Sequence, residues 1–156
     1  MIIARNIAAG LKRVDPSNAS TYDARYLDYA RRLKAAVEKW VKEMAPLRGM
    51  KVVTYHKSWP YFARRFGLVV VENVEPRPGI PPSAAHTSRV IQEIKAQKVK
   101  VLVMEPYFSR DVPDAIARET GVKVVVMSPS TGGLPGVDSY IAMFDKNIQL
   151  LLQAAR

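Results

Sequence analysis

Hydrophobic residues in the first third of the chain recur at the spacing of α-helices. A first set lies three or four positions apart: Ile3, Ile7, Leu11 and Val14. It predicts a helix over residues 2–14. Asp15 and Pro16 then favour a new helix start, because Asp is a good N-cap and Pro suits the first helical position. We therefore expect a long second helix over 16–45. Its apolar face has seven members: Tyr22, Tyr26, Tyr29, Leu33, Val37, Trp40 and Met44.

After residue 50 the pattern changes to short, Val-rich segments that alternate with helical ones. Four segments are predicted to be strands: 51–55, 68–72, 99–104 and 122–127. Helices are expected between and after them: 59–66, 83–98, 109–120 and 138–154. Short, apolar, β-branched strands separated by helices are typical of a parallel sheet that is buried on both faces. The fold class is thus α/β, a four-stranded parallel sheet flanked by helices, with a long N-terminal helix.

This pattern divides the chain into N-terminal helices over 1–48 and an α/β lobe over 49–156. The commonest strand order for so small a sheet is 2-1-3-4, with right-handed crossovers. Hydroxyl and carboxylate side chains are expected to begin the helices of the lobe, in the manner of N-caps. These candidates are Ser58, Ser83 and either Ser109 or Asp111. Four prolines and a glycine predict an irregular loop over 73–82.

Composition narrows the possible functions. The 156 residues include no cysteine, which excludes disulfides and thiolate zinc sites. No apolar run approaches the roughly 20 residues of a membrane span, and no signal peptide is expected at the start. The net charge of +10 is concentrated in residues 1–66, which hold 14 Lys and Arg against 5 Asp and Glu. A basic interaction domain that uses the helix at 16–45 is therefore one alternative, although solvated helix faces are the favoured explanation of the charge.

Two side chains with metal-binding chemistry follow predicted strands directly. His56 comes after the first strand and Glu105 after the third. In a 2-1-3-4 sheet these positions flank the switch point, where open α/β sheets bind ligands. A neutral imidazole nitrogen is a good metal ligand, and a carboxylate at a strand end must be solvated, paired or liganding. His86, the other histidine, is expected to face solvent near the start of a helix.

Motifs of the common enzyme classes are missing. The sequence has no Gly-x-Ser-x-Gly elbow, no His-Glu-x-x-His pair and no Gly-x-Gly-x-x-Gly fingerprint. The Gly- and Pro-rich loop at 128–136 lacks the spacing and the lysine of a phosphate-binding loop. None of these patterns favours an enzyme. A flavodoxin-like module that binds phosphate or a nucleotide through this loop remains a second alternative.

The order of several segments resembles the zinc- and manganese-binding solute-binding proteins of bacterial ABC transporters. Five segments carry the resemblance: Asn6–Tyr22; Thr54-Tyr-His56 together with Tyr61–Gly67; Val103-Met-Glu105-Pro; Glu119–Val126; and Asp138-Ser-Tyr140 together with Met143 and Asn147. The resemblance implies two α/β lobes joined by a rigid helix, with a divalent metal in the cleft between them. This chain is then similar to the C-terminal lobe plus the inter-lobe helix.

The resemblance also implies a ligand set and partners. His56 matches a metal-binding histidine, and Glu105 is a candidate substitute ligand. Ser128 stands where the family usually has an aspartate ligand, and a serine hydroxyl is a weak zinc ligand. Two further histidines would come from a first lobe that this chain lacks. The implied cargo is zinc, or manganese, which a periplasmic or extracytoplasmic protein delivers to an ABC permease in the membrane. Without a first lobe, the N-terminal helices are expected to form a homo-oligomer, and no nucleic acid is expected as a partner.

Overall fold

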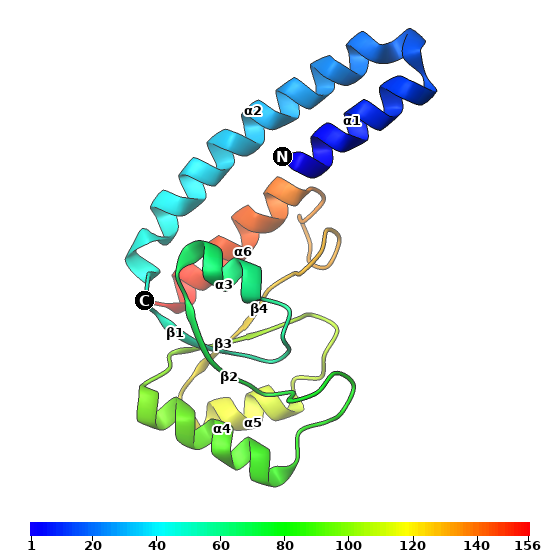
Figure 1. Cartoon of the computed structure of the whole chain (residues 1–156). Helices are drawn as coiled ribbons and strands as arrows, with labels where there is room; N and C mark the ends of the chain where they lie inside the picture. Colours follow the sequence, from blue (N-terminus) through cyan, green and yellow to red (C-terminus); the bar gives the residue numbers. More distant parts are fainter. The chain divides into compact units, whose positions relative to one another are not determined.

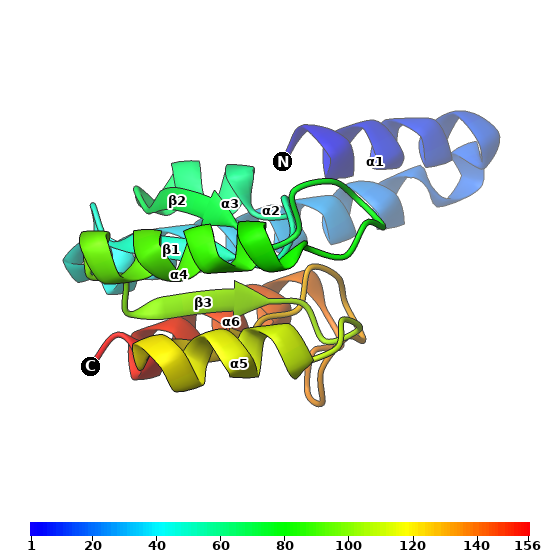
Figure 2. The same ribbon diagram turned by 90° about the horizontal axis from the view of Figure 1, so that it is seen from below.

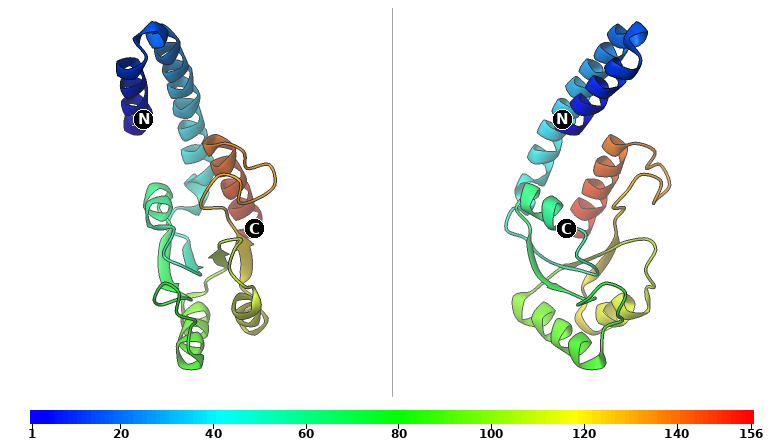
Figure 3. Two further views of the ribbon diagram at one scale, coloured as in Figure 1. Left: turned by 90° about the vertical axis from the view of Figure 1, so that its right-hand side faces the viewer. Right: turned by 45° about the vertical axis from the view of Figure 1, so that its right-hand side comes forward.

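A computed structural model describes residues 1–156 and divides into two compact units. The first comprises Met1–Lys42 and the second Glu43–Arg156. Figure 1 shows the elements of each along the chain. In the first unit α1 (Ile2–Val14) and α2 (Ala19–Met44) run antiparallel, as all the views show (Figure 3). A short 3-10 turn, Pro16–Asn18, precedes α2 where the long helix was expected to begin. The ammonium group of Lys12 pairs with Asp23 at 2.7 Å across the two helices.

The second unit is built on four short parallel strands. They are β1 (Lys51–Thr54), β2 (Val69–Asn73), β3 (Val101–Met104) and β4 (Lys123–Val126). Their order in the sheet is β2-β1-β3-β4, and every neighbouring pair is parallel. The predicted class and the predicted 2-1-3-4 order are therefore both confirmed. The order places the loops that follow β1 and β3 on adjacent strands at one end of the sheet.

Helices cover both faces of this sheet. They are α3 (Pro60–Phe66), α4 (Ala84–Gln97), α5 (Asp111–Thr120) and α6 (Tyr140–Ala154). Val53 and Leu102 belong to one core cluster together with Ile94 of α4 and Ile116 of α5. Seen from below, α4 and α5 lie on the near side of the strands (Figure 2). Alternate strand residues point to the opposite face, which α3 and α6 cover (Figure 1).

The helix termini follow the predicted chemistry in part. Ser83 caps α4 by accepting a hydrogen bond from the amide of His86, and Ser139 caps α6 in the same way. Ser58 does not cap α3, because Trp59 holds that position and makes no side-chain cap bond, so this expectation was wrong. Asp111, one of the two residues expected to open α5, is its first residue, and Arg110 is the N-cap. No helix combines the length and the apolar character needed to cross a membrane.

Candidate metal site

The backbone beyond β1 and β2 brings His56 beside a carboxylate. The amide of Glu75 donates to the carbonyl of Tyr55 at 2.8 Å, and the amide of Tyr55 donates to Val103 at 2.7 Å. The parallel hydrogen-bonding pattern therefore continues beyond the ends of β1 and β2, to Tyr55 and Glu75. Since His56 comes directly after Tyr55, its ring lies at the carboxyl end of the sheet, next to the side chain of Glu75.

His56 and Glu75 form a direct side-chain pair. Nδ1 of His56 contacts Oε2 of Glu75. The His56 side chain is 24% exposed, whereas that of Glu75 is only 6% exposed. The second oxygen, Oε1 of Glu75, accepts a hydrogen bond of 2.7 Å from the amide of Gly79. Gly79 adopts a φ of 75°, a conformation that glycine tolerates best, so the 73–82 loop folds back onto the carboxylate.

Aromatic rings border the imidazole. The ring centroid of Phe108 lies 5.8 Å from that of His56 and 4.7 Å from that of Tyr55. Tyr107 packs on Phe108 at 4.8 Å and is itself 65% exposed. These rings belong to the loop after β3, so the loops that follow the two central strands meet at His56. They shield one side of the imidazole and leave it partly open to solvent.

Negative charge gathers at this end of the sheet. Burial raises the pKa of Tyr55, and the carboxylates of Glu75 and Glu105 raise it further. Burial also raises the pKa of Tyr107, as do the same two carboxylates, while a hydrogen bond with Ser58 lowers it. Both carboxylates therefore lie close enough to act on both phenols.

Glu105 is fully buried at the end of β3. Its exposed fraction is 0%, and neither carboxylate oxygen has a hydrogen-bond partner. A second buried polar atom without a partner, Nε1 of Trp59, belongs to the loop after β1. Burying an unpaired carboxylate is costly, so few such groups occur in native proteins. Glu105 is therefore the most unusual polar group of the lobe, and it has no access to solvent.

Ser128 is held inside the protein by other residues. Its hydroxyl donates to the carbonyl of Ser130 at 2.5 Å. The side chain of Asn147 on α6 binds both the amide and the carbonyl of Ser128. The amide of Gly132, in the same loop, donates to Val137 at 2.6 Å. Two amides of the loop are therefore bonded within the protein and are not available to a phosphate.

The chain contains no cluster of three or more His, Cys, Asp and Glu side chains suited to a metal ion. Glu75 is the site residue that sequence reasoning missed. Glu75 lies two residues beyond the end of β2, so the rule used for His56 and Glu105, a polar residue directly after a strand, does not select it. Residue 75 was instead assigned to an irregular loop, because the prolines around it dominate the local pattern.

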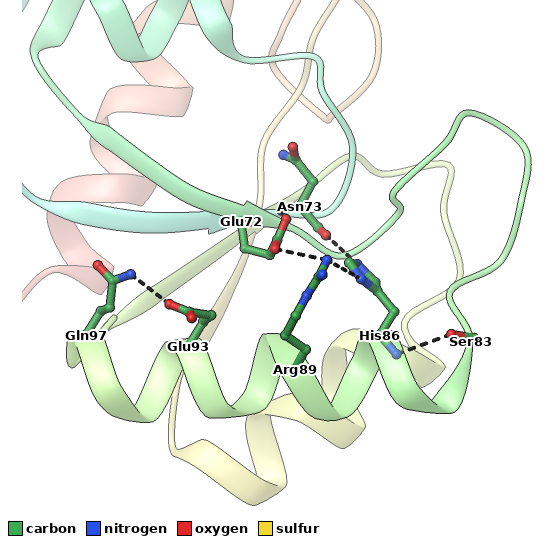
Figure 4. A network of polar contacts seen from close by, with 7 residues as sticks. All are labelled: Glu72, Asn73, Ser83, His86, Arg89, Glu93 and Gln97. Atoms are coloured by element: carbon green, nitrogen blue, oxygen red, sulfur yellow. Dashed lines mark hydrogen bonds and ion pairs between the residues drawn. The ribbon is translucent and has the colours of Figure 1, made fainter.

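His86 does not face solvent as expected. Its Nε2 lies 2.9 Å from the carbonyl oxygen of Asn73, and its Nδ1 lies 3.0 Å from the guanidinium of Arg89. Arg89 also pairs with Glu72 at 3.3 Å, so the network ties α4 to β2 (Figure 4). Both ring nitrogens of His86 are therefore engaged, and His56 is the only histidine with a ring nitrogen to offer a metal.

Curated relatives are zinc proteins. The chain is 25% identical over 128 residues to the high-affinity zinc uptake system protein ZnuA of Brucella abortus, covering 82% of this chain and 38% of that protein. It is also 25% identical over 153 residues to the zinc-binding protein AdcA of Streptococcus pyogenes, covering 96% of this chain and 30% of AdcA. The chain therefore spans roughly a third of the length of these relatives.

Solved structures agree with the fold. A crystal structure of ZnuA matches with a TM-score of 0.83 and 27% identity, over 96% of this chain and 56% of the other. The solute-binding protein FpvC of Pseudomonas aeruginosa, in complex with Mn²⁺, matches with a TM-score of 0.77 and 33% identity, over 95% and 56% of the two chains. FpvC has also been solved with Ni²⁺.

The family model described as "zinc-uptake complex component A periplasmic" matches residues 1–154, almost the whole chain. This agrees with the parallel α/β lobe. The matched proteins are solute-binding proteins and not enzymes. The chain belongs to the ZnuA family of periplasmic metal-binding proteins of ABC transporters, and it covers about half of the fold of its solved relatives.

Proposed function

We propose that this chain is the C-terminal lobe, with the inter-lobe helix, of a zinc-type solute-binding protein that captures a divalent cation and delivers it to an ABC permease. The observation that carries the proposal is His56. Its ring stands at the carboxyl end of the sheet with Nδ1 against Glu75 and no hydrogen bond to Nε2. Family membership supports the same function and a periplasmic or extracytoplasmic location.

His56 supplies one imidazole ligand in this proposal. A tetrahedral zinc site needs four ligands, so one histidine leaves it incomplete. Glu105 and Ser128 are proposed as further ligands, but both are fully buried and must become accessible before they can reach a metal. The remaining ligands come from parts of the relatives that this chain does not span, or from a second copy. Metal binding by this chain alone is accordingly weak.

Zinc is the preferred cargo. Imidazole nitrogen suits zinc, whereas manganese favours carboxylate and other oxygen ligands. The accessible donor at the site is an imidazole, while the nearest carboxylates are buried. The curated relatives above are named for zinc, and FpvC has been solved with manganese and with nickel. The affinities for manganese and nickel should therefore be measured beside the affinity for zinc.

A calorimetric zinc titration of the chain and of the variant His56→Ala tests the proposal. We expect measurable binding by the unaltered chain and none by the variant. The matched control is His86→Gln, which removes the other imidazole and keeps a donor near the carbonyl of Asn73. This control should bind zinc as the unaltered chain does. Equal binding by His56→Ala would remove His56 from the site, and no binding by any of the three would contradict metal capture by this chain.

A further inference from the structure

The pair formed by His56 and Glu75 selects one of the two tautomers of the imidazole. An ionised carboxylate only accepts hydrogen bonds, so the ring nitrogen that faces it carries the proton. In this structure that nitrogen is Nδ1, because it contacts Oε2 of Glu75. In the neutral ring the other nitrogen, Nε2, then holds the lone pair that a metal needs.

Glu75 is itself held in place, which makes the selection firm. Oε1 accepts from the amide of Gly79 at 2.7 Å, so both carboxylate oxygens have partners. The side chain is 6% exposed, and water competes little for either bond. The backbone bond from Glu75 to Tyr55 fixes the main chain beside the histidine. The orientation of the carboxylate thus follows from the fold and does not depend on a bound metal.

We infer that Glu75 is a positioning residue for metal capture: it holds His56 in the tautomer and orientation that present Nε2 to the cation. This inference rests on the proposed function, in which His56 is a ligand. Metal-binding histidines usually donate their second ring N–H to a carboxylate or a carbonyl. That partner fixes the ring and makes the liganding nitrogen more basic. Glu75 therefore contributes to metal affinity without touching the metal.

His86 provides an internal reference with the opposite tautomer. Its Nε2 faces the carbonyl oxygen of Asn73, which can only accept, so Nε2 carries the proton. Its Nδ1 faces the guanidinium of Arg89, which can only donate (Figure 4). The chain has two histidines, and we expect ring ¹⁵N spectra to show a protonated Nδ1 in one and a protonated Nε2 in the other.

The variant Glu75→Gln provides the sharpest test. The amide of Gly79 is a donor, so the glutamine places its oxygen there and its NH₂ group against Nδ1 of His56. Nδ1 must then accept, and the proton moves to Nε2. The loop keeps its anchor while the tautomer of the histidine inverts. A purely structural role for Glu75 would leave the tautomer unchanged.

Two properties of this variant are measured, the tautomer of His56 and the affinity for zinc. Long-range ¹H–¹⁵N correlation spectra of the metal-free chain report the tautomer of His56, with His86 as the reference. Calorimetry with zinc should show an affinity lower by about 10- to 100-fold, the usual effect of losing such a partner. The matched control is Glu72→Gln, which removes a nearby carboxylate that pairs with Arg89 and not with His56. It should keep the His56 tautomer and bind zinc within about 2-fold of the unaltered chain, since no partner of a liganding histidine is lost.

The outcomes separate this inference from the proposed function. The inference is overturned if Nε2 of His56 is protonated in the unaltered chain, or if Glu75→Gln leaves the tautomer unchanged. It is also overturned if Glu75→Gln binds zinc normally while His56→Ala does not, and in that case the proposed function stands. Normal zinc binding by His56→Ala overturns both. The tautomer spectra need no metal, so they test the positioning independently of zinc binding.

Discussion

Asn147 of α6 hydrogen-bonds both backbone groups of Ser128, the second residue after β4. Its Nδ2 donates to the Ser128 carbonyl at 2.7 Å, and its Oδ1 accepts from the Ser128 amide at 2.9 Å. Both residues are almost completely buried. The Asn147 side chain thus satisfies two backbone groups just beyond the end of β4, as a neighbouring strand would, and it joins the sheet to α6.

Replacing Asn147 with Leu should destabilise the lobe strongly. The change leaves a buried amide and a buried carbonyl without partners, at a cost of roughly 2–5 kcal/mol in the free energy of unfolding. Urea denaturation followed by circular dichroism measures this loss. Gln149→Ala, at an exposed position on the same helix, is the matched control and should change stability by about 0.5 kcal/mol or less. Equal effects of the two changes would contradict the bridging role of Asn147.

Glu105→Leu should make the protein more stable. The leucine removes a fully buried carboxylate that has no hydrogen-bond partner, so the free energy of unfolding at neutral pH should rise by about 1–3 kcal/mol. Chemical denaturation with and without zinc tests this. A loss of stability would mean that the carboxylate has a buried water or cation as partner. A gain in stability accompanied by weaker zinc binding would mean that the carboxylate is retained for metal capture.

Asp15 should remain ionised to unusually low pH. Hydrogen bonds from Ser17, then Tyr22, then Asn18 lower its pKa from 3.8 to about 2. Because the folded pKa is depressed, the stabilisation is fully present above pH 3.8 and is lost as the pH falls through about 2. Carboxyl ¹³C NMR should place the midpoint near 2. In Tyr22→Phe the midpoint should rise toward 3.8, and an unchanged midpoint would exclude the Tyr22 bond as a cause.

The apolar face of α1 should drive self-association. Ile3 is 76% exposed and Ile7 is 57% exposed, and they lie on one face of the helix. Static light scattering across a concentration series should show a mass that rises above 17.4 kDa. Ile7→Lys should keep the monomer mass at every concentration, whereas Lys34→Glu, at an exposed position on α2, should not. A monomer mass for the unaltered chain at all concentrations would count against this prediction.

The spacing of hydrophobic residues and the runs of β-branched residues determined most of the fold. The elements were predicted to within a few residues, because helix and strand periods are local properties of the sequence. The parallel class followed from strands that are apolar on both faces. The 2-1-3-4 order was the commonest choice among those open to so small a sheet, and the structure confirmed it. His56 was placed at the ligand-binding edge by its position directly after a predicted strand.

The partners of the site residues depended on the tertiary structure. Glu75 meets His56 across 19 positions of sequence, and only the β1–β2 ladder brings the two together. His86 was expected in solvent, but the carbonyl of Asn73 on the neighbouring strand binds it. Glu105 is fully buried, which its position directly after a strand did not predict. Local sequence specifies backbone conformation, whereas the partner and the tautomer of a polar side chain depend on contacts between residues far apart in sequence.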